Sequence, residues 1–248
     1  MTELVHLSVA DGIATITLDS EHNRNALSAQ FVRELTEHVA TADADVDSRA
    51  ILIRSGGTVF CSGADLSEAA GGGMAQGATA LIALQRQIAT ASKPVVVELA
   101  GPVRAGGLGI VGAADIVIAA QSVTFALTEV RLALAPAIIS ASLLPRLSAR
   151  AASDLFLTAR TFAAAEAAQI GLVTRAVPPE ELAAEVARVL VDLGKGYPQG
   201  LRETKKLLNR DLVDRIDTLG DDLAAQSAEL FGSDEAREAM TAFLNRKK

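Results

Sequence analysis

The sequence predicts an α/β fold in which units of two strands and one helix precede a C-terminal helical region. Half of the 248 residues are apolar and few are aromatic, which favours a large core of small and branched aliphatic side chains. The first two-thirds of the chain repeat β-rich runs and helical spacing, whereas the last third is rich in Ala, Leu, Glu and Arg. We therefore expect a core over residues 1–178 and a helical region over residues 179–248.

The chain is predicted to begin with a β-hairpin and an amphipathic helix. Two β-rich runs in "LVHLSVADGIATITLDS" flank the turn letters "ADG", which are typical of a hairpin. Ser28 then stands where an N-cap is expected, because apolar residues recur every four positions after it, at Phe31, Leu35 and Val39.

Further strands and helices are predicted in order along the rest of the chain. The strand candidates, each built around an apolar run, are "RAILIRS" (49–55), "VVVEL" (95–99), "DIVIAA" (115–120) and "VTFALT" (123–128). Residues 71–77 are glycine-rich, which indicates a mobile surface loop, and residues 78–92 return to helical spacing. From about Ala141 onward we expect almost only helix, with Ser233 as the N-cap of the last one.

Charge and cysteine content argue against several classes of function. The net charge of −7 provides no basic surface for nucleic acid or an anionic membrane. Cys61 is the only cysteine, which excludes an internal disulfide and a cysteine metal cluster and suits a reducing cytoplasm. The N-terminal residues lack the pattern of a signal peptide, and no apolar run approaches roughly 18 residues. We expect a cytoplasmic protein that neither spans a membrane nor binds nucleic acid.

A glycine-rich run, "GGLGIVGAADIVIAA" (106–120), contains G-x-G-x-x-G at Gly107, Gly109 and Gly112. A dinucleotide loop needs a strand running directly into the glycines and a long crossover helix after them. Here "AGPVRA" intervenes before the glycines, and a strand pattern resumes after about two helical turns, too soon for such a crossover. Two other interpretations stay open: glycines for close backbone packing, or backbone N–H groups before a short helix that form an oxyanion hole.

Few other residues are candidates for chemistry. The three histidines, His6, His22 and His38, lie in separate predicted elements and are interpreted as structural or surface residues. G-x-S-x-G, P-loop and H-E-x-x-H motifs are absent, so no metal site is expected. Glu98 and Glu129 lie in runs that are otherwise apolar. Burial would raise the pKa of each carboxyl group and make it a usable acid or base near neutral pH. The alternative is that each carboxylate is a structural charge paired with a cation.

Several motifs together resemble the enoyl-CoA hydratase/isomerase family, also called the crotonase family. They are "NRNALS" (23–28), "FCSGADL" (60–66), "KPVVVELAGPVRAGGLGIVGAADIVIAA" (93–120), "FALTEVRLALAP" (125–136) and "AAEAAQIGLVTRAVP" (164–178), in family order over most of the chain. The resemblance implies a crotonase-like spiral of ββα units that binds a coenzyme A thioester, with a C-terminal helical region for oligomerisation. It is nearest to single-glutamate, methylglutaconyl-type hydratases of fatty acid metabolism.

The resemblance assigns roles to individual residues. The backbone N–H groups of Ser62 and Gly106 would hold the thioester oxygen as it becomes an enolate, and Glu129 would be the catalytic carboxylate. Arg24 would contact a phosphate. The coenzyme A path would be lined by Ala26, Gly63, Ala64, Asp65 and Leu66, with Asp65 capping the next helix. No cofactor is expected beyond the coenzyme A of the substrate, and the assembly would be a homotrimer or a dimer of trimers.

The sequence departs from the family pattern at Gly109, where many family hydratases carry a second catalytic glutamate. We expect Gly109 to line the substrate site without a catalytic role. Glu98 is a hypothetical substitute for the missing carboxylate. Residues 135–140, "APAIIS", also lack the family's glycines, which makes that wall of the acyl pocket more apolar. The favoured reading is a hydratase of 2-enoyl-CoA; the alternatives are an isomerase that converts 3-enoyl-CoA to 2-enoyl-CoA, a non-catalytic acyl-CoA-binding scaffold, and other acyl-CoA chemistry such as hydrolysis.

Overall fold

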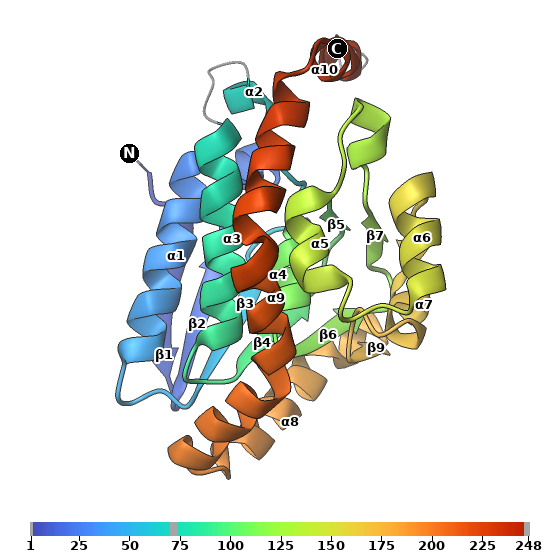
Figure 1. Ribbon diagram of the computed structural model, residues 1–248. Coiled ribbons are helices and arrows are strands. Elements are labelled where there is room, and N and C mark those ends of the chain that lie inside the picture. The colour runs from blue at the N-terminus through green and yellow to red at the C-terminus, as the bar shows by residue number, and fades with distance from the viewer. Residues whose placement is uncertain (1, 70–73, 246–248) are drawn as a thin grey trace.

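A computed structural model describes residues 2–69 and 74–245, and its main sheet has six strands (Figure 1). In spatial order the strands are β1 (Val5–Ala10), β2 (Ile13–Leu18), β3 (Ala50–Ser55), β4 (Val95–Leu99), β6 (Ile116–Ala120) and β9 (Arg175–Val177). Only β1 and β2 pair antiparallel; every other neighbouring pair is parallel. Parallel strands require crossover connections, and these bring loops from distant parts of the sequence to the same edge of the sheet.

The hairpin predicted at the N-terminus is present and has a two-residue turn. Asp11 and Gly12 both have positive φ, 52° and 76°. This conformation matches the right-handed twist of the flanking strands, and Asp-Gly is a favoured pair for it. The turn places Ile16 and Leu18 of β2 in the core.

A small second sheet lies beside the main one and carries the segments that reach the site. It contains β5 (Val103–Arg104), β7 (Thr124–Ala126) and β8 (Phe162–Ala163). Stacking of Phe125 on Phe162, with ring centroids 5.4 Å apart, joins β7 to β8. β5 leads into α4 (Gly107–Ala113), and β7 leads into the 3₁₀ helix η2 (Glu129–Leu132).

Three long helices form a layer beside the main sheet, and α8 (Leu182–Gly194) contacts its inner strands β3 and β6. Figure 1 shows α1 (Ala29–Ala44), α3 (Met74–Thr90) and α9 (Pro198–Gly232) running side by side, with α3 packed against both neighbours. The predicted Ser28 cap is confirmed, because its hydroxyl accepts from the Phe31 N–H. The remaining helices are η1 (Glu21–Asn23), α2 (Leu66–Ala69), α5 (Ala137–Leu143), α6 (Ala149–Thr158), α7 (Ala164–Gln169), η3 (Pro179–Glu181) and α10 (Asp234–Asn245).

The prediction of nearly continuous helix after Ala141 was wrong in two places. β8 and β9 lie in that region, and β9 supplies the edge strand of the main sheet beside β6. Both strands are only two or three residues long, too short to show periodicity. The predicted loop over 71–77 was also partly wrong, because α3 already begins at Met74; residues 71–73 lie outside the described part of the chain.

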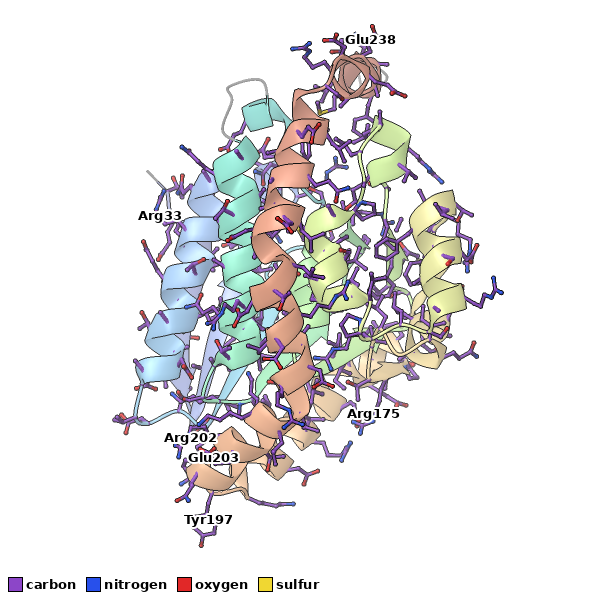
Figure 2. All side chains as sticks on the ribbon, in the orientation of Figure 1. Arg33, Arg175, Tyr197, Arg202, Glu203 and Glu238 are labelled. Carbon is purple, nitrogen blue, oxygen red and sulfur yellow. The ribbon has the colours of Figure 1, made fainter. Side chains whose placement is uncertain are left out.

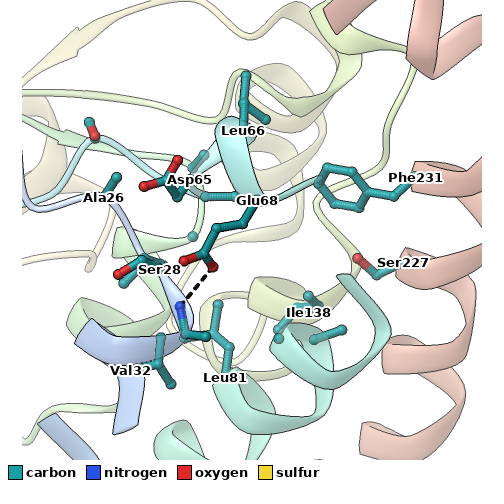
Figure 3. Close-up of a pocket in the computed structure, with 18 of the residues that line it drawn as sticks. Ala26, Ser28, Val32, Asp65, Leu66, Glu68, Leu81, Ile138, Ser227 and Phe231 are labelled. Atoms are coloured by element: carbon teal, nitrogen blue, oxygen red, sulfur yellow. Dashed lines mark hydrogen bonds between the residues drawn. The ribbon is translucent and has the colours of Figure 1, made fainter. Parts of the chain in front are cut away.

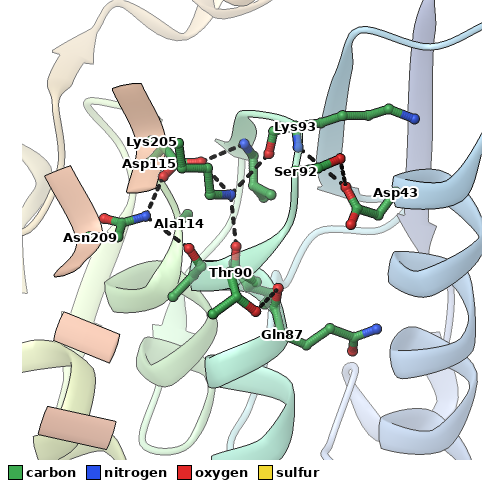
Figure 4. Close-up of polar contacts among 12 residues, drawn as sticks. Asp43, Gln87, Thr90, Ser92, Lys93, Ala114, Asp115, Lys205 and Asn209 are labelled. Carbon is green, nitrogen blue, oxygen red and sulfur yellow. Dashed lines mark hydrogen bonds and ion pairs between the residues drawn. The ribbon is translucent and has the colours of Figure 1, made fainter. Parts of the chain in front are cut away.

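A buried ion pair fastens α9 to the sheet (Figure 4). Lys205 Nζ lies 2.8 Å from Asp115 Oδ2 and also donates to the carbonyl oxygens of Ile88 and Lys93. Asp115 in turn accepts from the Val95 N–H and from Asn209. The charges of Lys205 and Asp115 are therefore paired with each other and hydrogen-bonded to further groups, which is the condition under which a buried ion pair is tolerated.

Charged side chains lie on the surface of the molecule. Figure 2 shows Arg33, Arg175, Arg202 and Glu203 pointing away from the body of the molecule. No helix among residues 2–69 and 74–245 is both long and apolar enough to cross a membrane.

Candidate active site

A cavity of about 990 Å³ lies where α1, α3, α5 and α9 meet (Figure 3). Its walls come from the start of α1, α2 and the loop before it, the N-terminal half of α3, the turn before α4, η2, α5 and the ends of α9 and α10. This volume lies within the range of small-molecule and cofactor sites.

Most of the predicted site residues meet in this cavity. Its lining includes Arg24, Ala26, Ser62, Ala64, Asp65, Leu66, Gly106 and Glu129. Gly63 and Gly109 are not part of the lining; both are buried behind it. Segments separated by more than 100 residues in the sequence are thus brought to one site, as the motifs predict.

Glu129 is the carboxylate that stands out in this site. It is the first residue of η2, separated by two residues from the end of the short strand β7. Its Oε2 atom is buried and has no hydrogen-bond partner among the described residues. Burial raises the pKa of Glu129 to about 7, and the bond from its own backbone N–H opposes this only in part. A carboxyl group with this pKa can both take up and release a proton near neutral pH.

The backbone N–H of Gly106 is available to a ligand. Gly106 is the N-cap of α4, and in the described part of the chain its N–H meets no acceptor. A Cβ at this position would lie 2.7 Å from the Leu27 side chain at the cavity wall. A larger residue here would have to displace the end of the Leu27 side chain at the wall beside the free N–H.

The other predicted oxyanion donor, Ser62, is engaged elsewhere. Its N–H donates to the Arg24 carbonyl oxygen at 3.1 Å, and its hydroxyl donates to the Asn23 carbonyl oxygen. The Ala64 N–H, two residues on, meets no acceptor within the described residues. The structure therefore corrects the pairing: it favours Ala64 over Ser62 as the partner of Gly106.

Gly63 explains why Ala64 lies near Gly106. Gly63 has a φ of +97°, and a Cβ there would lie 2.9 Å from the Ala105 Cβ. Only glycine allows this close approach of the loop to the residue before Gly106. On its other side the loop is held by the Leu27 N–H, which donates to the Gly63 carbonyl oxygen at 2.8 Å.

Asp65 has the capping role predicted for it. Its Oδ1 accepts from the Ser67 N–H at 3.0 Å and from the Ser67 hydroxyl, at the start of α2. Asn23 donates to the other oxygen, which ties this loop to the one before α1. Burial alone would raise the pKa of Asp65, but the bonds from Ser67 and Asn23 hold it below its usual range. Asp65 is thus a structural anion rather than a proton carrier.

Gly109 does not contribute to the cavity, which corrects its assignment to the substrate site. A Cβ at Gly109 would lie 3.0 Å from Gln85 and 3.1 Å from Ile139. Gln85 is fully buried and accepts a 2.6 Å hydrogen bond from Ser142, whose hydroxyl also lies 3.3 Å from the Gly109 carbonyl oxygen. The space that a second glutamate would need is filled by this Gln85–Ser142 pair.

Glu98 does not replace the missing carboxylate. It lies on β4, outside the residues that line the cavity. Burial raises the pKa of Glu98, and the nearby charge of Arg54 opposes the shift. The hypothesis that Glu98 acts with Glu129 is therefore not supported.

One part of the cavity wall was not predicted from the sequence. Ser227 and Phe231 of α9, and Phe243 and Leu244 of α10, line the cavity but belong to no recognised motif. Helical spacing marks them only as one face of a helix, which in most proteins packs into a core.

His22, interpreted as structural or surface, is exposed and also lies at the cavity lining. No group of three or more His, Cys, Asp or Glu side chains that could hold a metal ion occurs among the described residues.

Comparison with known proteins adds an independent view of this geometry. The sequence model of the enoyl-CoA hydratase/isomerase family matches residues 8–248. A crystal structure of an enoyl-CoA hydratase from Mycobacterium avium superposes with a TM-score of 0.92 at 42% identity, covering 99% of this chain and 98% of that one. The short-chain-enoyl-CoA hydratase of Clostridium acetobutylicum is 29% identical over 95% of this chain and 92% of its own. A CoA-thioester hydrolase of Mycobacterium tuberculosis, named for a methyl-dioxo-hexahydroindene-carboxyl-CoA, is 32% identical over 83% of each chain.

Proposed function

Because the chain belongs to the enoyl-CoA hydratase/isomerase family, we propose that it adds water reversibly to a 2-enoyl-CoA thioester with Glu129 as its only catalytic carboxylate. The family, the crotonase-like α/β fold and the class of enzyme agree with the prediction from sequence. The observation that carries the proposal is the unpaired, buried Oε2 of Glu129 in the same cavity as the free N–H of Gly106.

The proposed reaction starts with the thioester carbonyl oxygen bound by the N–H groups of Gly106 and Ala64. These donors are oriented before charge develops on that oxygen, and each such donor is worth roughly 3 kcal/mol in the transition state. Glu129 takes a proton from water as the water oxygen bonds to C3, and the electron pair of the double bond moves to form the enolate. Glu129 then returns that proton to C2, so the hydroxyl and the proton of one water end on adjacent carbons.

The rest of the substrate is placed by the wall residues. We propose that Arg24, at the mouth of the cavity, contacts a phosphate of coenzyme A. Ala26, Asp65 and Leu66 would line the path of the pantetheine arm, and Gly63 would act through the backbone position it gives Ala64. Proton transfer by one carboxylate needs no cofactor beyond the coenzyme A of the substrate.

Isomerisation is the second candidate, and one observation favours it. Gly109 has no carboxylate, and any side chain there would have to displace Gln85 and Ile139. A single base that removes a proton from C2 of a 3-enoyl-CoA and returns it to C4 would complete that reaction. A non-catalytic scaffold would have no use for a buried, unpaired carboxyl group that costs free energy to keep charged.

Assembly and location are part of the proposal. We expect a homotrimer or a dimer of trimers, supported by apolar side chains exposed on α9, where Leu207 and Leu208 are 72% and 75% exposed; Tyr197, before α9, also points outward in Figure 2. A light-scattering mass in solution tests this directly. A cytoplasmic setting is supported by the single, buried cysteine, Cys61, and a role in fatty acid metabolism follows from the proposed acyl-CoA substrate.

The assay that tests the function offers crotonyl-CoA and 3-hexenoyl-CoA to the protein in separate reactions. Loss of the 2-enoyl thioester absorbance with formation of 3-hydroxybutanoyl-CoA is the expected result. Migration of the double bond in 3-hexenoyl-CoA without hydration of crotonyl-CoA would instead identify an isomerase. Free coenzyme A is measured in the same samples, since its release would indicate hydrolysis. Tight binding of both esters with no product at all would support the scaffold.

A further inference from the structure

Ser227 is the exception among the buried polar residues of the described chain. Its exposure is 4%, yet its hydroxyl makes no hydrogen bond within residues 2–69 and 74–245. Every other buried polar side chain there has at least one partner: Ser20, Asn25, Ser28, Ser48, Gln85, Ser142, Lys205 and Asn209. The Ser227 oxygen is not sealed in the core but opens on the cavity, so a water or a ligand bound there supplies its missing partner.

The hydroxyl of Ser227 faces the cavity rather than its own helix. A serine or threonine in a helix often donates to the carbonyl four residues earlier, as Thr218 of the same helix does to Asp214 at 2.7 Å. Ser227 makes no such bond and is part of the cavity lining. Figure 3 shows it pointing from α9 into the space between Ile138 and Phe231, across the cavity from Ala26 and Ser28.

Among the described residues, the wall around Ser227 is largely apolar and carries no positive charge. Over α3 and from residue 128 to residue 245, the lining contains four polar side chains, Gln76, Thr128, Glu129 and Ser227, and no Lys, Arg or His. The other lining residues of these segments are Gly77, Ala78, Ala80, Leu81, Ala83, Leu132, Leu134, Ala135, Pro136, Ala137, Ile138, Ile139, Phe231, Phe243 and Leu244. A carboxylate on the acyl chain would be left without a counter-charge here, which is costly. A neutral oxygen would satisfy Ser227 without that cost.

We infer that the acyl group bound in this cavity carries a neutral oxygen function, a hydroxyl or a ketone, beyond its reacting carbons, and that Ser227 is the specificity-determining residue that hydrogen-bonds it. Ser227 can donate to a ketone or accept from a hydroxyl. The inference deepens the proposed function and rests on it, because it requires the thioester end of the ligand to lie between Gly106 and Glu129. It argues against a distal carboxylate, and so against a methylglutaconyl-type acyl group.

Binding of saturated acyl-CoA esters tests the inference without any chemistry. Equal-length pairs, with and without a hydroxyl or ketone at successive carbons from C5 to C10, are titrated against the wild-type protein and Ser227→Ala. For each pair, the Kd of the unsubstituted ester is divided by the Kd of the ester with the oxygen. With the oxygen at one carbon of the acyl chain, this ratio is expected to be about fivefold lower in Ser227→Ala than in the wild type, which is the size of one neutral hydrogen bond. Esters with a terminal carboxylate are expected to bind more weakly than their unsubstituted partners.

Ser140→Ala is the matched control, because Ser140 lies on the neighbouring α5, outside the cavity lining, and its hydroxyl bonds the Ala137 carbonyl oxygen. This variant is expected to leave every ratio unchanged. An unchanged ratio at every carbon in Ser227→Ala would overturn the inference and leave Ser227 as a site for bound water. Hydration of crotonyl-CoA, measured separately, reports on the proposed function alone, so the two can fail independently.

Discussion

Glu129→Gln is expected to lower kcat for the hydration of crotonyl-CoA by about two orders of magnitude or more. The amide has nearly the shape of the carboxyl group but cannot take a proton from water. Glu129 is the one carboxylate in the cavity that is both buried and unpaired among the described residues. Coenzyme A esters should still bind with a Kd close to that of the wild type, because the thioester contacts come from the backbone of Gly106 and Ala64. Steady-state kinetics and a titration with butanoyl-CoA measure the two effects.

Glu98→Gln is the matched control for this experiment. Glu98 is likewise a glutamate whose pKa burial raises, but it is only half-buried and lies outside the cavity lining. Its variant is expected to keep turnover within about twofold of the wild type, as for a side chain that does not touch the reacting atoms. A fully active Glu129→Gln would show that Glu129 is not the catalytic carboxylate. A large loss of turnover in Glu98→Gln would show that Glu98 takes part in the reaction.

Lys205→Met is expected to lower the free energy of unfolding by about 3–5 kcal/mol, the typical cost of leaving one partner of a buried ion pair uncompensated. Methionine fills a similar volume but cannot pair with Asp115 or donate to the carbonyl oxygens of Ile88 and Lys93. The loss also weakens the attachment of α9, which carries Ser227 and Phe231 to the cavity. Urea unfolding followed by circular dichroism measures the change.

The neighbouring residue provides the control. Lys206 is exposed and, within the described residues, pairs only with Glu203 on the helix surface, at 3.1 Å. Lys206→Met is therefore expected to change the free energy of unfolding by less than about 0.5 kcal/mol. Similar values for the two variants would mean that the buried pair is not what holds α9 in place.

The parts of the fold that the sequence predicts well are those with a strong local signal. The hairpin follows from Asp11 and Gly12, and the start of α1 follows from Ser28 and the apolar stripe after it. β8 and β9 were missed because two or three residues cannot show a period and are held by pairing with β7 and β6. Tertiary partners, which lie far away in the sequence, decide such strands.

The site was predicted where a motif marks it and missed where only packing does. Gly106 and Glu129 came from motifs and meet in the cavity. The choice between Ser62 and Ala64 needed the hydrogen bond from Ser62 to Arg24, which no sequence pattern shows. Ser227 was missed because a serine on one face of a long helix has no signal until its neighbours are known.

The pH dependence of kcat/KM for crotonyl-CoA tests the single-carboxylate mechanism most directly, because it reports the ionisation of the free enzyme. Glu129 must be deprotonated to accept a proton from water, and burial raises its pKa to about 7. Activity should therefore rise with pH through a midpoint near that value and then level off, since no separate acid is needed. Glu129→Gln should lose this rise. A profile that is flat between about pH 5.5 and about pH 8.5, or that falls with rising pH, would contradict catalysis by Glu129.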